Sequence, residues 1–342
     1  MATVGTGRRA RTRRVATGRA LLATLLAAGL AAGCTASNGP GDDGRGAPRT
    51  TRPGGTEGTE TEGADGDGRP PVLAVKIDNA AAARPQRGLE SADVVYVEQV
   101  EGGLSRLMAV YATRLPESVG PVRSAREADL ELLRQFDRPV LAFSGAQGRL
   151  LPLIDRAPLE PLTPGTSDAG ADAYVRDATR SAPHNLYLLP RRSMDGPPGR
   201  ASLTTGFRDG PPPAGGEPES TRTVRYPAAR FTFTWSDARN RWLVSMDSTP
   251  TVTARGEPVA PATVVVQYVT VRPSGYHDSR GNNTPYTETV GSGRATVLRD
   301  GRAHDVRWSR PDASDGTAFT TEDGVPVNFA QGQVWVVYAE AD

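Results

Sequence analysis

The chain has 342 residues, of which 37% are hydrophobic and 6% aromatic, and its 40 Lys and Arg residues against 39 Asp and Glu residues give a formal net charge of +1 at pH 7. This length suggests roughly two domains of ordinary size. Six of the arginines fall within the first 19 residues. The rest of the chain therefore lacks the concentrated basic face that a nucleic-acid-binding domain needs.

The first 33 residues have the pattern of a bacterial signal peptide. The arginines precede the apolar run ALLATLLAAGLAA, which is too short to span a membrane. The run leads into Leu30-Ala31-Ala32-Gly33-Cys34, which is similar to the lipobox of bacterial lipoproteins, although Ala31 stands where that motif usually has Leu. In this motif the cysteine is diacylated with palmitate-type chains and becomes the mature N-terminus.

Cys34 is the only cysteine in the chain, so it has no partner for an internal disulfide, and we expect it to carry lipid. The alternative is a free thiol left by ordinary secretion. Residues 34–70 contain almost no large apolar side chain, which predicts a disordered tether. Because two acyl chains hold a protein stably at a bilayer, the expected location is the extracytoplasmic face of the cell membrane.

Residues 71–190 mix strand and helix patterns, which predicts a layered α/β N-terminal domain. Short apolar runs predict strands over 71–78, 93–100, 106–113 and 139–145, and the connection EGGLS joins the second and third as a hairpin. Helical spacing of apolar residues predicts a helix from Ser124 to Phe136, a short helix over 148–157 that is broken near Pro152, and a third helical segment over 172–180.

Residues 191–222 are rich in Gly and Pro and are expected to form a linker or a long loop. Residues 223–342 then show short strand patterns separated by turn signals such as RDGR and EDGV. They predict a C-terminal antiparallel β domain with strands in RFTFTWS, RWLVSMD, TVVVQYVTV, ATVLRD, AHDVRWSR and QVWVVYAE. The fold class expected for the whole chain is therefore α+β.

Common catalytic signatures are missing from the sequence. It has no phosphate loop, dinucleotide fingerprint, HExxH motif or GxSxG elbow. The three histidines lie far apart, so we expect neither a metal site nor a cofactor. Ser124 or Ser144 with His184 offers only the kind of triad candidate that any chain contains.

The stretch GPVRSAREADLELL, residues 120–133, combines a helix start with two arginines that a helix does not require. Ser124 and Glu127 fit a capping box. Arg123 and Arg126 do not, because cations are unfavourable near a helix N-terminus. Either they form internal salt bridges, or they hold a carboxylate or phosphate ligand. The sequence leaves both interpretations open.

Charged and polar residues at the predicted strand ends and loops are the available partners, because charges on apolar strands must be paired when they are buried. Lys76 is singled out as the only lysine in the chain, which suggests a position that needs a compact ammonium. The candidate binding residues are Lys76, Asp78, Asn79, Arg84, Glu98, Glu101, Arg106, Arg123, Ser124, Arg126, His184 and Asn185.

The motifs VKIDN, RPQRGL, ADVVY, EGGLSR, GPVRSAR and RSAPHNLYL occur in this order between residues 71 and 190. This pattern resembles the YerB-like bacterial lipoprotein family, which has a domain of unknown function in N- and C-terminal parts. The segment from TVVVQYV to GQVWVVY is similar to the C-terminal part more loosely. Ser105 stands where Thr is common, and the region near residue 210 is unusually rich in Pro. The resemblance implies a secreted, lipid-anchored protein and no particular activity or catalytic residue.

Two functions fit these observations. The favoured one is a binding or assembly module of the cell envelope, attached to the membrane by lipid on Cys34, that recognises an anionic envelope component or a protein partner. The alternative is a hydrolase or phosphotransferase acting on cell-wall polymers, with Asp78, Glu98 and Glu101 as acid and base. Arg106, Arg123 and Arg126 would then stabilise negative charge. An open cleft holding these groups favours a ligand site, whereas complete internal pairing favours a structural network.

Overall fold

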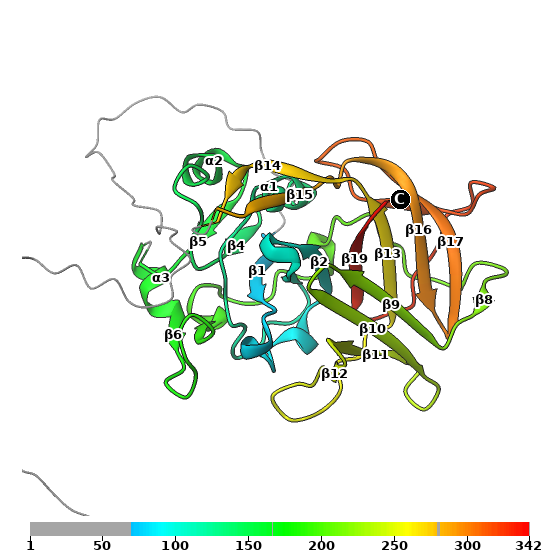
Figure 1. The fold of residues 1–342 in the computed structure, drawn as a ribbon, viewed down its shortest axis with the longest axis horizontal. Coiled ribbons are helices and arrows are strands. Elements are labelled where there is room, and N and C mark those ends of the chain that lie inside the picture. The colour runs from blue at the N-terminus through cyan, green and yellow to red at the C-terminus, as the bar shows by residue number, and fades with distance from the viewer. Residues whose placement is uncertain (1–69, 166, 279–280, 342) are drawn as a thin grey trace, which may run out of the picture. The chain divides into compact units, whose positions relative to one another are not determined.

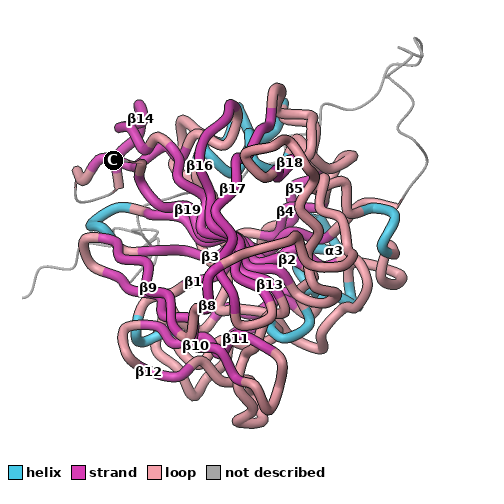
Figure 2. The backbone as a smooth tube through the Cα atoms, turned by 90° about the vertical axis from the view of Figure 1, so that its right-hand side faces the viewer, coloured by secondary structure: helices cyan, strands magenta, loops and turns pink. Residues whose placement is uncertain are grey.

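The computed structural model describes residues 70–165, 167–278 and 281–341. The predicted signal peptide, Cys34 and all but the last residue of the predicted tether lie outside the described residues. Most of the described chain forms strands, as Figure 2 shows in magenta, and the fold is therefore mainly β, with few helices. The α+β expectation is only loosely consistent with this structure. No helix in the described ranges is long and apolar enough to cross a membrane.

One mixed eleven-stranded sheet runs through the described chain in the order β18-β17-β16-β13-β19-β2-β3-β1-β4-β5, and β8 pairs with β17 (Figure 1). Its strands are β1 (Leu73–Asp78), β2 (Val94–Gln99), β3 (Ser105–Tyr111), β4 (Val140–Ala142), β5 (Glu160–Leu162), β8 (Glu217–Pro218), β13 (Thr263–Val269), β16 (Gly291–Arg299), β17 (Arg302–Arg310), β18 (Ala318–Thr320) and β19 (Val334–Glu340). The strands predicted from apolar runs are confirmed, and β2 and β3 form the predicted hairpin.

The last strand of the chain joins the two predicted segments. Strand β19 lies between β13 and β2 and is parallel to both, with Val334 opposite Thr263 on one side and Val94 on the other (Figure 1). The prediction of a purely antiparallel C-terminal domain is therefore wrong for β19, which is parallel to both of its neighbours. Strands buried on both faces, such as β1 and β3, appear in the sequence as continuous apolar runs because neither face meets water.

A second sheet covers part of one face of the large sheet. It has the order β12-β11-β10-β9, with β9 (Thr221–Tyr226), β10 (Ala229–Ser236), β11 (Arg241–Met246) and β12 (Thr249–Pro250). Phe231 and Phe233 alternate with less buried residues along β10, and the ring of Phe233 meets that of Trp335 on β19 edge-on at 6.1 Å. Alternation of this kind is typical of a strand with one buried face.

Helices α1 (Glu127–Leu133) and α2 (Leu151–Arg156) and a hairpin lie over the opposite face. The last residue of α3 (Ser167–Ala173) is instead buried in the cluster that holds Phe231 of the second sheet. In α1, Leu132 and Leu133 are buried in the same cluster as Met108 and Trp308 of the sheet. A hairpin of β14 (Val271–His277) and β15 (Asn283–Thr287) reaches α1, and its Tyr286 hydroxyl donates to Glu131 at 2.8 Å. The yellow and orange hairpin lies beside α1 and α2 in Figure 1.

Three helix predictions need correction. Helix α1 begins at Glu127, with Arg126 rather than Ser124 as its N-cap. Helix α2 is not broken near Pro152, because that residue lies in the first turn, where a proline costs no hydrogen bond. The third helix, predicted over 172–180, is wrong over most of that range: α3 ends at Ala173, and β6 (Tyr174–Arg176) follows it and pairs with β7 (Leu186–Leu188).

The Gly- and Pro-rich stretch 191–222 packs along both segments. The Gly199 N–H donates to Ala112 O at 2.7 Å, and Thr205 O accepts the Thr317 N–H at 2.8 Å. The domain boundaries drawn from the sequence remain a prediction, since one sheet contains strands from both sides of this stretch.

Candidate functional site

The GPVRSAR stretch is extended and lies beside the end of β1. Asp78 N–H donates to Pro121 O, and Arg123 N–H donates to Lys76 O, each at 2.8 Å. On its other side, Val122 N–H donates to Leu186 O of β7 at 2.7 Å. These backbone bonds explain why Ser124 does not cap the helix, because this part of the chain already pairs with the end of β1 and with β7. They also bring β7 and the loop before it next to β1.

Arg126 is explained by internal pairing. Its guanidinium donates to Glu101 Oε2 through Nε at 3.1 Å and Nη2 at 2.6 Å, and Nη1 donates to the backbone oxygens of Ser124 and Ala125. The residue is only 3% exposed. At the N-cap, the Arg126 N–H donates to Asp129 Oδ2 at 2.7 Å. Of the two interpretations of the arginines, the salt bridge accounts for this one.

Lys76 lies in the same closed network. Its ammonium donates to Asp129 Oδ1 at 2.7 Å and contacts Glu98, and no part of the lysine is exposed. Burial lowers the pKa of Lys76, although Asp129 opposes that shift. Burial likewise raises the pKa of Asp129, opposed by Lys76. The network joins β1, β2 and α1, and it places Glu98 and Glu101 where they serve internal cations.

Asp78 joins two other predicted residues at a more open position. Its Oδ2 lies 2.7 Å from His184 Nδ1 and 3.3 Å from Arg123 Nε, while Oδ1 accepts the Ala80 N–H. Burial raises the pKa of Asp78, but His184, Arg123 and Arg106 outweigh it and hold that pKa below its usual value. Because an ionised carboxylate only accepts hydrogen bonds, His184 Nδ1 carries the proton.

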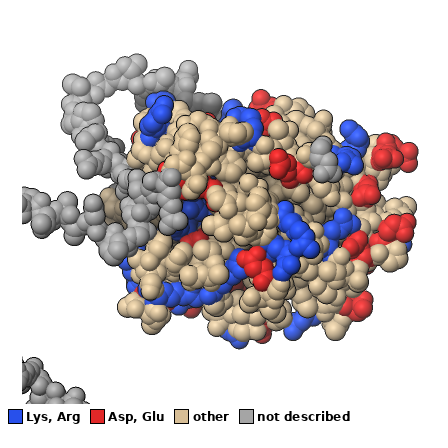
Figure 3. Space-filling model, in the orientation of Figure 1, with Lys and Arg blue, Asp and Glu red and all other residues tan. Residues whose placement is uncertain are grey.

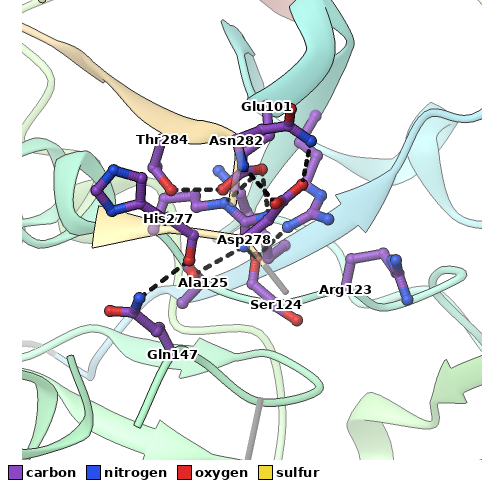
Figure 4. Close-up of polar contacts among 12 residues, drawn as sticks. Glu101, Arg123, Ser124, Ala125, Gln147, His277, Asp278, Asn282 and Thr284 are labelled. Atoms are coloured by element: carbon purple, nitrogen blue, oxygen red, sulfur yellow. Dashed lines mark hydrogen bonds and ion pairs between the residues drawn. The ribbon is translucent and has the colours of Figure 1, made fainter. Parts of the chain in front are cut away.

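The outer ends of Arg123 and His184 remain available. Their side chains are 13% and 22% exposed, against 6% for Asp78. Within the described ranges, the terminal nitrogens of Arg123 and the Nε2 of His184 have no hydrogen-bonding partner. Figure 4 shows the Arg123 side chain pointing away from Ser124 and the β14–β15 loop. The site therefore presents a guanidinium and an imidazole on a shared buried carboxylate.

Other predicted residues shape the loops around this site. Arg84 bonds to Asn79 and pairs with Asp247 Oδ2 at 2.8 Å. Asn79 also donates to Ser105 Oγ at 2.8 Å. In the His184 loop, Asn185 donates to Arg180 O at 3.3 Å. These contacts fix loop geometry, and they occupy the polar groups of Asn79 and Asn185.

Arg106 and Ser124 lie on the closed side. Arg106 Nη1 donates to Ser124 O at 2.9 Å, and both residues are buried. The Ser124 hydroxyl lies 3.5 Å from that of Ser144. His184 contacts Asp78 through its Nδ1.

Three residues that hold the site and the buried charge network in place were not among the candidates predicted from the sequence. Asp129 follows the signal of an acidic residue in a first helical turn, but its partner Lys76 is 53 residues away. Arg180 anchors the His184 loop by donating to Ala83 O and Pro85 O, each at 2.9 Å. Thr284 of β15 donates to Glu101 Oε1 at 2.6 Å (Figure 4). No local pattern announces contacts between segments so far apart.

In the parts of the chain that the structure covers, no three His, Cys, Asp or Glu side chains are placed to hold a metal ion. At Asp78, the Arg123 guanidinium and the His184 imidazole instead share one carboxylate. Such a set of donors suits an anionic ligand more than a metal.

Two family models match the chain in sequence order. Residues 57–198 match "Protein of unknown function (DUF3048) N-terminal domain", and residues 222–336 match its C-terminal domain. The chain belongs to the DUF3048 family. The resemblance to this family is thereby confirmed for its N-terminal and its C-terminal part.

Relatives from Bacillus subtilis agree with this membership. The curated protein "Putative lipoprotein YerB" of strain 168 is 46% identical over 65 residues, which are 19% of this chain and 20% of that protein. The match thus spans about a fifth of the relative's length. The crystal structure of YerB has the same fold, with a TM-score of 0.65 and 20% identity, over 80% of this chain and 91% of that one.

The two arginines of GPVRSAR should differ sharply in their effect on stability. Arg126→Gln leaves Glu101 buried without its cation and should lower the free energy of unfolding by about 3–5 kcal/mol. Arg123→Gln should cost less, about 1 kcal/mol, because it removes one contact at 3.3 Å from Asp78, which keeps His184 and the Ala80 N–H as partners. Urea denaturation followed by fluorescence measures both. Equal losses would contradict the assignment of Arg126 to the closed network.

The Asp78 interactions should stabilise the fold in a pH-dependent way. Since the pKa of Asp78 is lowered in the folded state, its contribution is present above the unfolded pKa of about 4 and is lost as pH falls through the folded pKa. Asp78→Asn should therefore destabilise the protein at pH 7 by about 1–3 kcal/mol. Denaturation curves at pH 7, 5 and 3 should show the gap from wild type narrowing below pH 4. A constant gap would refute the ionised pairing.

Proposed function

We propose that this protein is a lipid-anchored binding module of the cell envelope that holds an anionic group at Arg123 and His184. The observation that carries the proposal is the arrangement around Asp78. The carboxylate holds Arg123 through Nε and His184 through Nδ1, so that the other nitrogens of both side chains remain as outward contacts. A carboxylate or phosphate fits these contacts.

Guanidinium chemistry supports this choice of ligand. The planar end of an arginine pairs with a carboxylate or phosphate through two parallel hydrogen bonds. Asp78 holds the arginine in place beforehand, which reduces the entropy lost when a ligand binds. Arg106 lies close enough to influence Asp78 and adds positive potential behind the site. The ligand class that follows is an anionic envelope component, such as a peptidoglycan carboxylate or a wall-polymer phosphate, or an acidic segment of a partner protein.

The membrane attachment rests on Cys34 and on the name of the relative. Cys34 ends a lipobox-like sequence, and the matching protein from Bacillus subtilis is named as a lipoprotein. Lipid on Cys34 would hold the protein at the extracytoplasmic face of the cell membrane, where the Arg123 site meets envelope polymers.

An enzyme is the second candidate, and the oriented imidazole of His184 favours it. A histidine held by a carboxylate at Nδ1 presents Nε2 as a general base or acid. Glu98 and Glu101 do not fit the acid and base roles proposed from sequence, because Lys76 and Arg126 occupy them inside the protein. Any catalysis would therefore depend on His184 and Asp78, with Arg123 stabilising negative charge.

Removal of the lipid attachment site gives the first test. Cys34→Ser should release the protein from membranes into the culture medium, because no acylated residue remains. Fractionation and immunoblotting measure the distribution, and a Ser37→Ala variant just after the lipobox is the matched control. Continued membrane association of the Cys34→Ser protein would refute lipid anchoring.

Retention on purified cell wall tests the binding site. Arg123→Gln should weaken retention by about tenfold or more, as expected when a charge-assisted pair worth about 1.5–3 kcal/mol is lost. Arg191→Gln, which changes the same charge on an exposed residue, should bind as wild type does. Walls stripped of phosphate-bearing polymers distinguish phosphate from peptidoglycan carboxylate as the ligand.

Two results would decide against the proposal. Unchanged retention of a folded Arg123→Gln protein would remove the binding site. Turnover of labelled wall polymer that is lost in His184→Gln would instead establish the enzyme.

A further inference from the structure

A polar cleft opens where the small sheet stops covering the large one. Along β16, Leu298, Thr296 and Arg294 point to one face, because alternate residues of a strand share a face. Leu298 is buried in the core with Phe231 of the small sheet, whereas Arg294 is exposed. Beyond the covered part lies a cleft of about 430 Å³ that includes Arg222, Tyr268, Arg294, Asp305, Arg307 and Glu322.

Two arginines lie directly opposite each other on the floor of this cleft. Arg294 of β16 is in register with Arg307 of the antiparallel strand β17, and both are exposed. Neither forms an ion pair in the part of the chain that the structure describes. The Arg294 guanidinium lies 5.8 Å from the centre of the Tyr268 ring. Like charges directly opposite on paired strands destabilise a sheet, so the fold gains nothing from this pair.

The neighbouring acids do not neutralise the two arginines. Asp305 Oδ1 accepts the Thr296 hydroxyl at 3.0 Å, and Glu322 completes the lining. A third arginine, Arg222 of the edge strand β9, lines the cleft while pairing with Glu219 at 3.0 Å. The lining thus holds three cations and two acids, and the two cations that lack pairs face the same space.

We propose that this cleft binds a phosphoryl group between Arg294 and Arg307. Opposite residues on paired strands have Cβ atoms about 4.5–5.5 Å apart. Two guanidinium groups that start so close together can converge on a single anion. A phosphoryl group offers three acceptor oxygens around one centre, which serves two arginines better than the two oxygens of a planar carboxylate. The site is independent of Asp78, Arg123 and His184.

The test is calorimetric titration of the full chain, purified from membranes in mild detergent, at low ionic strength. The probes are inorganic phosphate, a short glycerol-phosphate oligomer and acetate. Arg294→Gln and Arg307→Gln should each raise the Kd for phosphate at least about fivefold, as the loss of one charge-assisted contact implies. Arg239→Gln, on an exposed turn, should leave it unchanged. Every titration is made in the Arg123→Gln background, so that phosphate or acetate bound at the first proposed site does not mask the result.

Stability provides the check on folding. Removal of one of two opposed cations should leave the thermal midpoint equal or higher, so weaker phosphate binding by a stable Arg294→Gln protein supports the site. Tighter binding of the oligomer than of phosphate supports it and identifies a polymer as the source. Acetate binding as tight as phosphate, unchanged phosphate binding in both variants, or equal loss in Arg239→Gln would overturn the proposal.

Discussion

The burial of Lys76 is the constraint around which the site is arranged. An ammonium with no exposed surface remains charged only when acids surround it, and Asp129 and Glu98 supply them from α1 and β2. This requirement fixes the start of α1 against the ends of the strands. The GPVRSAR stretch, which leads into α1, must then lie extended beside the end of β1. As a result Arg126 is buried beside Glu101, while Arg123 remains near the surface. Asp78, two residues beyond Lys76, is left for Arg123 and His184.

The same physics separates two kinds of charge pair. Inside, Glu101 accepts from a guanidinium and from a threonine hydroxyl, so both of its oxygens are occupied and the pairing serves the fold. At Asp78, one carboxylate oxygen contacts both Arg123 and His184, and the nitrogens of these two side chains outnumber the oxygens that accept from them. Such an excess of donors is what an anionic ligand completes. Charged groups that look alike in the sequence thus differ through the number of acceptors around them.

The strands were predictable from sequence, whereas their arrangement was not. Continuous apolar runs such as LAVKID and the alternation in RFTFTWS arise directly from burial on two faces or one. The parallel placement of β19 between β13 and β2 depends on pairing with a strand more than 200 residues earlier, which no local pattern encodes. Ser124 carries a real capping signal, but bonds from its neighbours to β1 and β7 override that local preference. His184 and Asp78 meet across 106 residues because the GPVRSAR stretch lies between their strands.

On the face drawn in Figure 3, basic and acidic groups lie interspersed at the right-hand side. The effect of an arginine on the stability of the fold helps to show whether it has another role. Arg123 is held by Asp78 and destabilises the fold little, so stability does not distinguish the two cases for it. The evidence for a ligand at Arg123 is that its outer nitrogens have no partner among the described residues. Arg294 and Arg307 oppose each other and weaken the strand pair they lie on. A fold dominated by hydrophobic burial tolerates that local loss, and a bound anion would reverse its sign by turning the repulsion between two cations into attraction of both for one ligand.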